Sequence, residues 1–422
     1  MHKGTANMAL SPWLASILRH DAPHAWVLRH NATHSSRFYP MDIARYDRQL
    51  NEYLHLLEYE ALDGADTLSR VDHETQGGLF IHLTSAIQQS NWEHFITLLS
   101  ELSDDSEQGE ELAQSLAWFP VSVTYSFIQY ALEHSSPVVQ AAAINASAAR
   151  GVDLPVAEVA SYLGAQDHRI TIAALRYLGN RKYHVDQLMS LVNTLLTSQH
   201  EGVRFNAIRA VLLLGDRERV SLLQSYVTQA CEYTREAIQL IYPLFDIAQQ
   251  EALTASILSA DLSPTIKLYA LAVSGDTGYV PTIIEWASQA DYARLAGESF
   301  AFITGIDIEE ENLCPVIEDE DESELQNLDN INVRRKQDPW AQAYESDLPI
   351  PSAERLQAWW SSHQEEFKKG QRWIAGKPYS QENLNTIATE GNQRQQRVAE
   401  IALALSYPGS YVHDLTLPAG IG

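Results

Sequence analysis

The chain has 422 residues, of which 45% are apolar and 20% are charged, a composition that allows a packed core and excludes disorder along the whole length. Its 55 acidic residues outnumber its 29 basic residues, which leaves a formal net charge of −26. Lysine and arginine supply most of the affinity for phosphate backbones and anionic lipids. The balance therefore argues against nucleic-acid and membrane partners and suits a basic protein partner.

The cysteines, Cys231 and Cys314, are too few for a disulfide framework or a cysteine-rich zinc site. No run of 18 apolar residues occurs, so we expect no membrane-spanning segment. Residues 8–18 are weakly apolar, but Pro12 interrupts them and no small-residue cleavage pattern follows, so we expect no signal peptide. These features predict a cytoplasmic protein.

The N-terminal part has a helical period of its own. In residues 41–57 one helical stripe collects the apolar and aromatic side chains Ile43, Tyr46, Leu50, Tyr53, Leu54 and Leu57. Residues 79–102 continue the helical pattern around Trp92. Neither segment matches the repeat that follows. Residues 1–118 are therefore predicted to form an atypical helical cap, which repeat arrays need to close an exposed apolar end.

The middle of the chain, residues 119–306, contains a repeat. Six segments share one pattern, with equivalent positions at Val139, Ile170, Val203, Thr234, Ile266 and Ala293. The steps between them are 31, 33, 31, 32 and 27 residues, the length of one helix pair with its turns. Second helices are expected over residues 186–196 and 220–230. Several helices are expected to end at a glycine, where the backbone φ becomes positive: Gly151, Gly179, Gly215, Gly275 and Gly305.

The residue after each equivalent position is basic in four of the six segments: Arg204, Arg235, Lys267 and Arg294. Together with the period and a small alanine nearby, this resembles the HEAT-repeat pattern, in which such arginines form a ladder between stacked repeats. The resemblance implies a HEAT-type α-solenoid in which the four residues are a structural ladder. The alternative is a stripe that binds a ligand.

An acidic stretch follows the repeat. Between positions 307 and 324 the chain has ten carboxylates and no basic residue, so residues 307–350 are predicted to be an acidic loop. The loop is either solvated or a lure for a basic partner. It lacks the glycine and the spacing of a calcium-binding EF-hand, and we expect no metal there.

The last part, residues 351–422, is predicted to be a helical tail. A helix is expected over residues 352–366, a short extended or turn segment over 371–378, and one further helix over 381–406. The tail contains Trp359, Trp360 and Trp373. These side chains either dock the tail on the last repeat or form an exposed aromatic surface for a partner.

Four segments of the C-terminal half then occur in a recognisable order: 295–307 (LAGESFAFITGID), 358–363 (AWWSSH), 370–378 (GQRWIAGKP) and 394–397 (RQQR). With Tyr46 to Leu50 near the start, they resemble a bacterial HEAT-repeat family of uncharacterised proteins found near type VI secretion clusters. The resemblance implies an immunity protein or an effector-handling factor. It implies no catalytic residues.

The sequence can be compared with the residues that known HEAT-like enzymes need for catalysis. An iron-dependent deoxyhypusine hydroxylase needs four His–Glu dyads, whereas this chain has two, at His73 and His200. HEAT-like DNA glycosylases need a basic concave face, which the net charge opposes. No phosphate-binding loop, nucleophile elbow or paired metal motif occurs. We therefore expect no enzyme activity, cofactor or metal, with a HEAT-like enzyme as a remote alternative.

The sequence thus predicts an all-α, HEAT-type solenoid that acts as a protein-interaction protein. Its expected role is cytoplasmic immunity, in which it binds and neutralises a basic toxin domain of a type VI secretion system. The alternative is an adaptor or chaperone that loads an effector. The predicted partner-binding residues are Asp307, Glu309, Glu310, Glu311, Glu318, Asp319, Glu320, Asp321, Glu322, Glu324, Trp359, Trp360 and Trp373.

Overall fold

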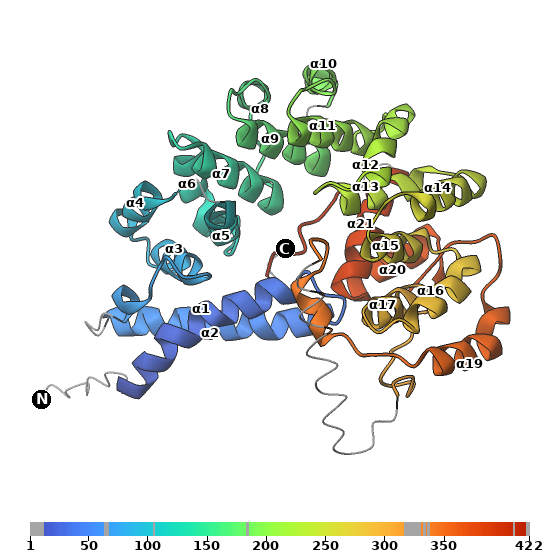
Figure 1. The fold of residues 1–422 in the computed structure, drawn as a ribbon. Helices are drawn as coiled ribbons and strands as arrows, with labels where there is room; N and C mark the ends of the chain where they lie inside the picture. The colour runs from blue at the N-terminus through green and yellow to red at the C-terminus, as the bar shows by residue number, and fades with distance from the viewer. Residues whose placement is uncertain are drawn as a thin grey trace, which may run out of the picture. The chain divides into compact units, whose positions relative to one another are not determined.

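The computed structural model describes residues 12–62, 67–103, 106–182, 185–315, 331, 335, 338–407 and 410–418. Within these ranges the regular secondary structure is almost entirely helical, which confirms the predicted all-α class (Figure 1). Strands are confined, in these ranges, to the antiparallel hairpin of β1 (Trp373–Ile374) and β2 (Lys377–Pro378). None of the described helices combines the length and the apolar character needed to cross a membrane.

The chain forms two compact units. Unit 1 comprises the described residues within Met1–Thr33, Pro40–Leu214 and Val412–Gly422, and unit 2 those within His34–Tyr39 and Gly215–Tyr411. The helices of unit 1 are α1 (Pro12–Ala32), α2 (Pro40–Leu62), η1 (Leu68–Arg70), α3 (Gly78–Gln88), α4 (Trp92–Glu101), α5 (Ser106–Leu116), α6 (Val121–Leu132), α7 (Pro137–Arg150), α8 (Val156–Leu163), α9 (His168–Arg181), α10 (Val185–Leu195) and α11 (Glu201–Leu213).

Helix α3 is the buried centre of the N-terminal part of unit 1. Its residues from Gly78 to Ile87 are all buried, because α1, α2, α4, α5 and α6 all pack against it. Its first turn is capped from another helix, since Glu111 of α5 accepts hydrogen bonds from the backbone N–H groups of Gly77 (3.1 Å) and Phe80 (2.9 Å). A carboxylate at this end of a helix also meets the positive end of the helix dipole.

Helix α5 and the repeat helices α7, α9 and α11 pack in sequence order, each on the next. Glycine was expected to end α9 at Gly179, and this was wrong: α9 continues to Arg181, and Lys182 takes the left-handed conformation after it. A Cβ at Gly179 would lie 3.2 Å from Leu213 Cδ1 and 3.3 Å from Ala210 Cα. Gly179 therefore allows α9 and α11 to approach closely, whereas Gly151 does end α7, with a φ of 69°.

The elements of unit 2 are η2 (Arg217–Leu223), α12 (Gln224–Thr228), α13 (Thr234–Ile241), η3 (Tyr242–Leu244), α14 (Ile247–Ser259), α15 (Pro264–Ser274), η4 (Thr277–Tyr279), α16 (Val280–Ala287), α17 (Ala293–Thr304), η5 (Ala343–Asp347), α19 (Ala353–His363), η6 (Gln364–Glu366), the hairpin, α20 (Gln381–Glu390) and α21 (Gln393–Ser406). Helices α13, α15 and α17 pack in order, and α21 packs on α13.

Two of the expected helices in unit 2 differ from the structure. The segment 220–230 is not one α-helix but the 3₁₀-helix η2 followed by the short α12. The helix expected over 381–406 is broken into α20 and α21. At the break Gly391 leaves the helical conformation, and Asn392 begins α21 with a capping box, in which its side chain and that of Gln395 each bond the other's backbone N–H.

The hairpin closes the C-terminal ends of two repeat helices. The Trp373 N–H donates to the Gly275 carbonyl after α15 (2.8 Å), and the Arg372 guanidinium donates to the carbonyls of Ser274 and Val273 (both 2.9 Å). The Ala375 and Gly376 N–H groups donate to the carbonyls of Phe302 and Ile303 in α17. The last carbonyls of a helix lack partners within it, so the hairpin supplies them and fixes both helix ends.

Candidate functional site

A cavity of about 310 Å³ lies within unit 2. Its walls are the end of α17, the turn after it, the hairpin, the end of α20, the start of α21 and the segment within His34–Tyr39. The lining residues with polar or charged side chains are Ser36, Arg37, Tyr39, Glu298, Asp307, Glu309, Lys377, Thr386, Glu390, Asn392 and Gln395.

Glycine makes one wall of the cavity possible. Gly305 ends α17 with a φ of 75°, and a Cβ at this position would lie 2.4 Å from the carbonyl carbon of Ala375. This close approach brings the hairpin, with Ala375 and Lys377, against the end of α17. The sequence therefore needs glycine here both for the backbone conformation and for space.

The turn after α17 contributes two of the predicted partner-binding residues, Asp307 and Glu309, to the cavity lining. Asp307 Oδ1 accepts the backbone N–H groups of Glu309 (2.8 Å) and Glu310 (3.0 Å), which fixes the turn. Glu309 Oε2 lies 3.2 Å from Arg37 Nη2 in a largely exposed ion pair. The same guanidinium donates to the carbonyl of Asp347, so Arg37 is held in place by the turn and by η5.

A buried ion pair lies at the cavity. Arg394 of α21 binds Glu298 of α17, with side-chain exposures of 7% and 4%, and the Tyr344 hydroxyl donates to Glu298 Oε1 (3.2 Å). The Arg394 guanidinium also lies over Tyr269, 4.4 Å from the ring centroid. Burial disfavours the charge on Arg394, but Glu298, together with Tyr344 and Tyr269, outweighs burial and leaves the pKa of Arg394 above its usual value.

Gln395, the next residue of α21, also lines the cavity and is 5% exposed. Its Oε1 accepts the Asn392 N–H at 3.1 Å in the capping box, which assigns Nε2 to the other position of the amide. Among the described residues, nothing accepts a hydrogen bond from Gln395 Nε2. Because Gln395 lines the cavity, this amide is available to an occupant of it.

The cavity is more acidic than basic. Four carboxylates line it, from Glu298, Asp307, Glu309 and Glu390, against the two cations Arg37 and Lys377. Glu390 is exposed in the last turn of α20, where the negative end of the helix dipole adds to its own charge. The arrangement is therefore suited to bind a cationic group, with a hydrogen-bond donor at Gln395 for an accompanying oxygen atom.

The other predicted acidic residues lie elsewhere or outside the described part of the chain. Glu310 and Glu311 are exposed on the turn after α17. Glu318, Asp319, Glu320, Asp321, Glu322 and Glu324 lie outside the described residues. Residues 338–350, the end of the predicted acidic loop, are packed rather than solvated, since Tyr344 and Leu348 are buried in the core of unit 2.

The structure places the three tail tryptophans mainly in the core. Trp360 and Trp373 are buried, with exposures of 6% and 8%, and Trp359 is half-buried and stacks on His363. All three pack in the cluster that joins α16, α17 and α19. This favours the docking of the tail over an exposed aromatic surface.

The predicted ladder residues make contacts of two kinds. In unit 1, Arg204 donates to the Ser198 carbonyl in the turn before its own helix (2.8 Å). In unit 2, Arg235 donates to the Trp340 carbonyl and Arg294 to the Leu348 carbonyl, so both hold the segment 338–350. Lys267 is half-buried on α15. The ladder itself stays a prediction, and Arg235 and Arg294 have a structural contact that it did not include.

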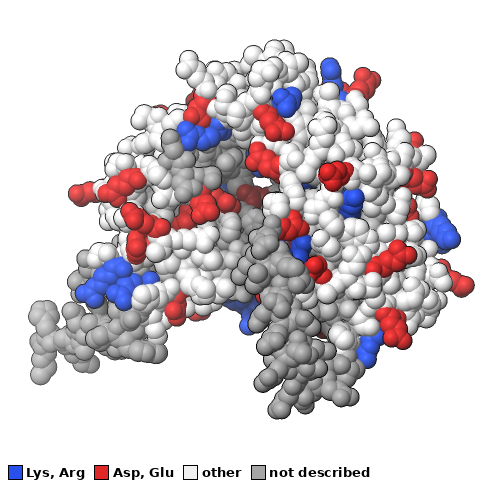
Figure 2. Space-filling view, viewed as in Figure 1, with Lys and Arg blue, Asp and Glu red and all other residues white. Residues whose placement is uncertain are grey.

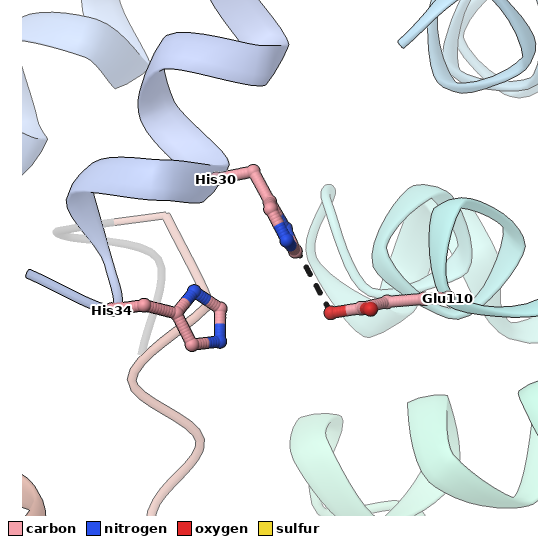
Figure 3. A group of neighbouring side chains, drawn as sticks. All are labelled: His30, His34 and Glu110. Carbon is pink, nitrogen blue, oxygen red and sulfur yellow. Dashed lines mark ion pairs between the residues drawn. The ribbon is translucent and has the colours of Figure 1, made fainter. Parts of the chain in front are cut away.

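The histidines of the two His–Glu dyads, His73 and His200, have local contacts. His200 caps α11 through Nδ1, which accepts the Val203 N–H at 3.3 Å, and His73 lies 3.6 Å from Glu101. A further pair in unit 1 joins His30 of α1 to Glu110 of α5, with 3.8 Å between Nδ1 and Oε1 (Figure 3). Such a pair is ionic only when the histidine is protonated.

Sequence reasoning found Asp307 and Glu309 but missed Arg37, Glu298, Lys377, Glu390 and Gln395 as cavity residues. One signal was present for Glu298, which interrupts an otherwise apolar stretch of a repeat helix. Another was the spacing of Asn392 and Gln395, which is typical of a capping box. No family model matches this chain, and no curated protein or solved structure does so either.

Proposed function

We propose that this chain is a HEAT-type α-solenoid that works as a protein-interaction protein. The observation that carries the proposal is the position of the six repeat segments. Their equivalent residues fall on α7, α9, α11, α13, α15 and α17, and within each unit these helices pack in order (Figure 1). Arrays of stacked helix pairs offer extended surfaces for binding proteins.

The charge supports a basic partner. The net charge is −26, and on the face shown in Figure 2 acidic side chains outnumber basic ones and are spread over the surface rather than gathered in one patch. A distributed field of one sign raises the rate of encounter with a partner of opposite charge. Such a field contributes little to the affinity, so the affinity must come from contacts at the interface.

The resemblance to the family found near type VI secretion clusters supports a more specific role. We propose that the chain is a cytoplasmic immunity protein, not an enzyme, which binds a basic toxin domain and covers its active face. An adaptor or chaperone that loads an effector is the second candidate. It shares the fold and the charge but leaves the toxin active. A HEAT-like enzyme is the remote alternative.

The test begins with capture of partners on the tagged full-length chain in the cells that encode it, followed by expression of each captured protein alone and together with the chain. Immunity predicts that a captured protein arrests growth when expressed alone and that the chain restores growth. An adaptor predicts a captured effector or spike protein whose toxicity the chain leaves intact. Captured proteins of acidic or neutral surface, bound equally well at high salt, would contradict the basic partner.

The acidic stretch gives a kinetic test of steering. Neutralising Glu318, Asp319, Glu320, Asp321 and Glu322 together removes five negative charges from a net 26. If the stretch only steers the partner, the association rate falls while the dissociation rate is nearly unchanged. If the stretch occupies a basic cleft of the partner, the dissociation rate rises. Rates that respond neither to these substitutions nor to salt would contradict electrostatic steering.

A further inference from the structure

We infer that the cavity of unit 2 binds a lysine or arginine side chain of a protein partner, together with the peptide carbonyl next to it. The inference rests on the proposed function, because it names the chemistry by which an interaction protein with this charge would hold its partner. Two features of the cavity carry it: the uneven charge of its walls and the unpartnered amide of Gln395.

The charge argument depends on which groups are already paired. Glu298 is bound to Arg394, and Glu309 to Arg37. Asp307 uses Oδ1 for two backbone N–H groups of its turn, so a further ligand meets its other oxygen. Glu390 lies at the end of α20, where the helix dipole adds negative potential. Asp307 and Glu390 are therefore the lining carboxylates that no ion pair among the described residues neutralises, against the one remaining cation Lys377, and they favour a cationic ligand.

The start of α21 also lines the cavity, and a helix start could attract an anion instead. Its first N–H groups are, however, already used. The Gln393 N–H donates to the Phe38 carbonyl (3.0 Å), and the Asn392 and Gln395 N–H groups are satisfied within the capping box. Lys377 and the amide of Gln395 are among the side-chain donors that line the cavity and can bind an oxygen atom of the ligand.

The Gln395 amide distinguishes a peptide from a simple cation. Its Nε2 is a donor in a residue that is 5% exposed, and a peptide carbonyl is the acceptor that every partner residue carries. A cavity of about 310 Å³ is at the small end of ligand sites, which suits one side chain and its peptide group.

The test uses the full-length chain and a blocked tripeptide, N-acetyl-Gly-Arg-Gly-amide. Its citrulline analogue is the uncharged isostere, and the glutamate analogue is the anionic control. Binding is measured by NMR on the side-chain amide of Gln395 in protein labelled with ¹⁵N-glutamine. Gln395→Glu assigns that signal and keeps the capping box, because a glutamate at this helix position caps equally well, but it removes the donor.

The arginine peptide should shift the Gln395 signal saturably at up to millimolar concentration, and the citrulline peptide should bind more weakly. Asp307→Asn combined with Glu390→Gln should weaken binding about tenfold, since two exposed ion pairs together contribute about 1.4 kcal/mol. Glu285→Gln removes an exposed charge of α16 outside the cavity and should leave the affinity unchanged.

Equal affinity for the arginine and citrulline peptides, tighter binding of the glutamate peptide, an equal loss in Glu285→Gln, or no shift at millimolar peptide would each overturn the inference. None of these results touches the capture and toxicity tests of the proposed function. A captured toxin with no peptide binding would therefore support the proposed function and contradict this binding site. Peptide binding without any captured partner would support the binding site and contradict the proposed function.

Discussion

The two units each bury a glutamate beside a helix end, and they stabilise it in opposite ways. In unit 1, Glu111 receives two backbone N–H groups at the start of α3. In unit 2, Glu298 is bound by the guanidinium of Arg394 and the hydroxyl of Tyr344. A buried carboxylate needs compensation. The two neutral donors do not offset burial at Glu111, whose pKa is raised, whereas the ion pair of Glu298 depends on both of its partners.

The two units also differ in the segments that hold their helices. Unit 1 joins its repeat helices through close apolar packing, as at Gly179 between α9 and α11, and through Arg150, which donates to the carbonyls of Ala117 and Trp118. Unit 2 adds segments that cross the ends and faces of its helices, and arginines hold their carbonyls or cap the helix ends. We therefore expect charge substitutions in unit 2 to loosen the segments that cross its helices, whereas the sensitive sites of unit 1 are Glu111 and the buried ion pair of Arg29 and Asp47.

The largest effect is expected for Arg394→Met. The variant leaves Glu298 buried without its cation, and breaking one side of a buried pair destabilises by about 3–5 kcal/mol. Hydrogen exchange in α17 and α21, with the amides of α9 as an internal reference, measures this locally. Arg394→Met combined with Glu298→Gln removes both charges and should recover most of the loss. Equal protection in wild type and Arg394→Met would show that the pair contributes little.

The second prediction concerns the pH dependence of unit 1. Burial is the main cause that raises the pKa of Glu111 from 4.5 to about 7, with help from the charges of Glu107 and Glu110 and against its two backbone hydrogen bonds. The folded state therefore holds a proton that the unfolded chain has already released. Stability is highest below pH 4.5 for this group and falls as pH rises to about 7, by about 3 kcal/mol at 1.36 kcal/mol per pH unit.

Hydrogen exchange of α3 amides between pH 5 and 8, corrected for the intrinsic exchange rate, measures this loss. Glu111→Gln keeps an acceptor for one N–H group and cannot ionise, so its stability should not change with pH through this group. The matched control is Glu107→Gln, which removes a neighbouring charge on the same helix. A slope that persists in Glu111→Gln would assign the pH dependence to other groups.

The third prediction compares two glycines that end helices with positive φ, Gly151 in unit 1 and Gly305 in unit 2. A Cβ at Gly151 meets the end of the Arg181 side chain at 3.3 Å, which can move. A Cβ at Gly305 would lie 2.4 Å from the Ala375 backbone. Gly151→Ala should therefore lower the free energy of unfolding by about 1 kcal/mol, for the left-handed conformation alone. Gly305→Ala should lower it by about 2 kcal/mol more, because the hairpin must also move.

Denaturant unfolding of both variants tests the difference, and exchange at Ala375 and Gly376 shows whether the hairpin has left α17. If Gly151→Ala and Gly305→Ala lower the free energy of unfolding by the same amount, the contact between Gly305 and Ala375 does not hold the hairpin in place.

The repeat period predicted every helix on which the six segments lie, because apolar side chains at helical spacing must face a core. The all-α class also followed from the sequence, and a short extended or turn segment was expected over 371–378, where the structure has the hairpin. The break between α20 and α21 was not predicted, although Gly391 and the spacing of Asn392 and Gln395 mark it in the sequence.

The cavity could not be predicted in the same way. Its residues come from the segment before α2, from α17 and from the tail, and periodicity reports only which face of a helix is buried. Asp307 and Glu309 were identified through composition, as members of an acidic stretch. Their neighbours Arg37, Lys377 and Gln395 depend on how the hairpin caps α17, which is a tertiary contact that local spacing does not encode.

The smallest effect is expected when the two repeat arginines Arg204 and Arg235 are replaced by alanine. Arg235 donates to the Trp340 carbonyl and lies 5.4 Å from the Tyr269 ring centroid, so its loss frees part of the segment 338–350. A hydrogen bond from a charged group contributes about 1.5–3 kcal/mol, and partial exposure of Arg235 favours the lower value. Arg204 bonds the Ser198 carbonyl within its own turn, and Arg204→Ala should cost about 0.5–1 kcal/mol.

The measurement is hydrogen exchange at residues 338–350, compared with exchange in α11. Arg235→Ala should accelerate exchange in the segment and leave α11 unchanged, and Arg204→Ala should do the reverse. Arg235→Lys separates the two contributions, since lysine keeps the charge but stacks poorly on an aromatic ring. It should recover only part of the protection. If instead both alanine variants melt like wild type while binding to the captured partner is lost, these arginines belong to the interface, and the repeat face presents a ligand stripe rather than a structural ladder.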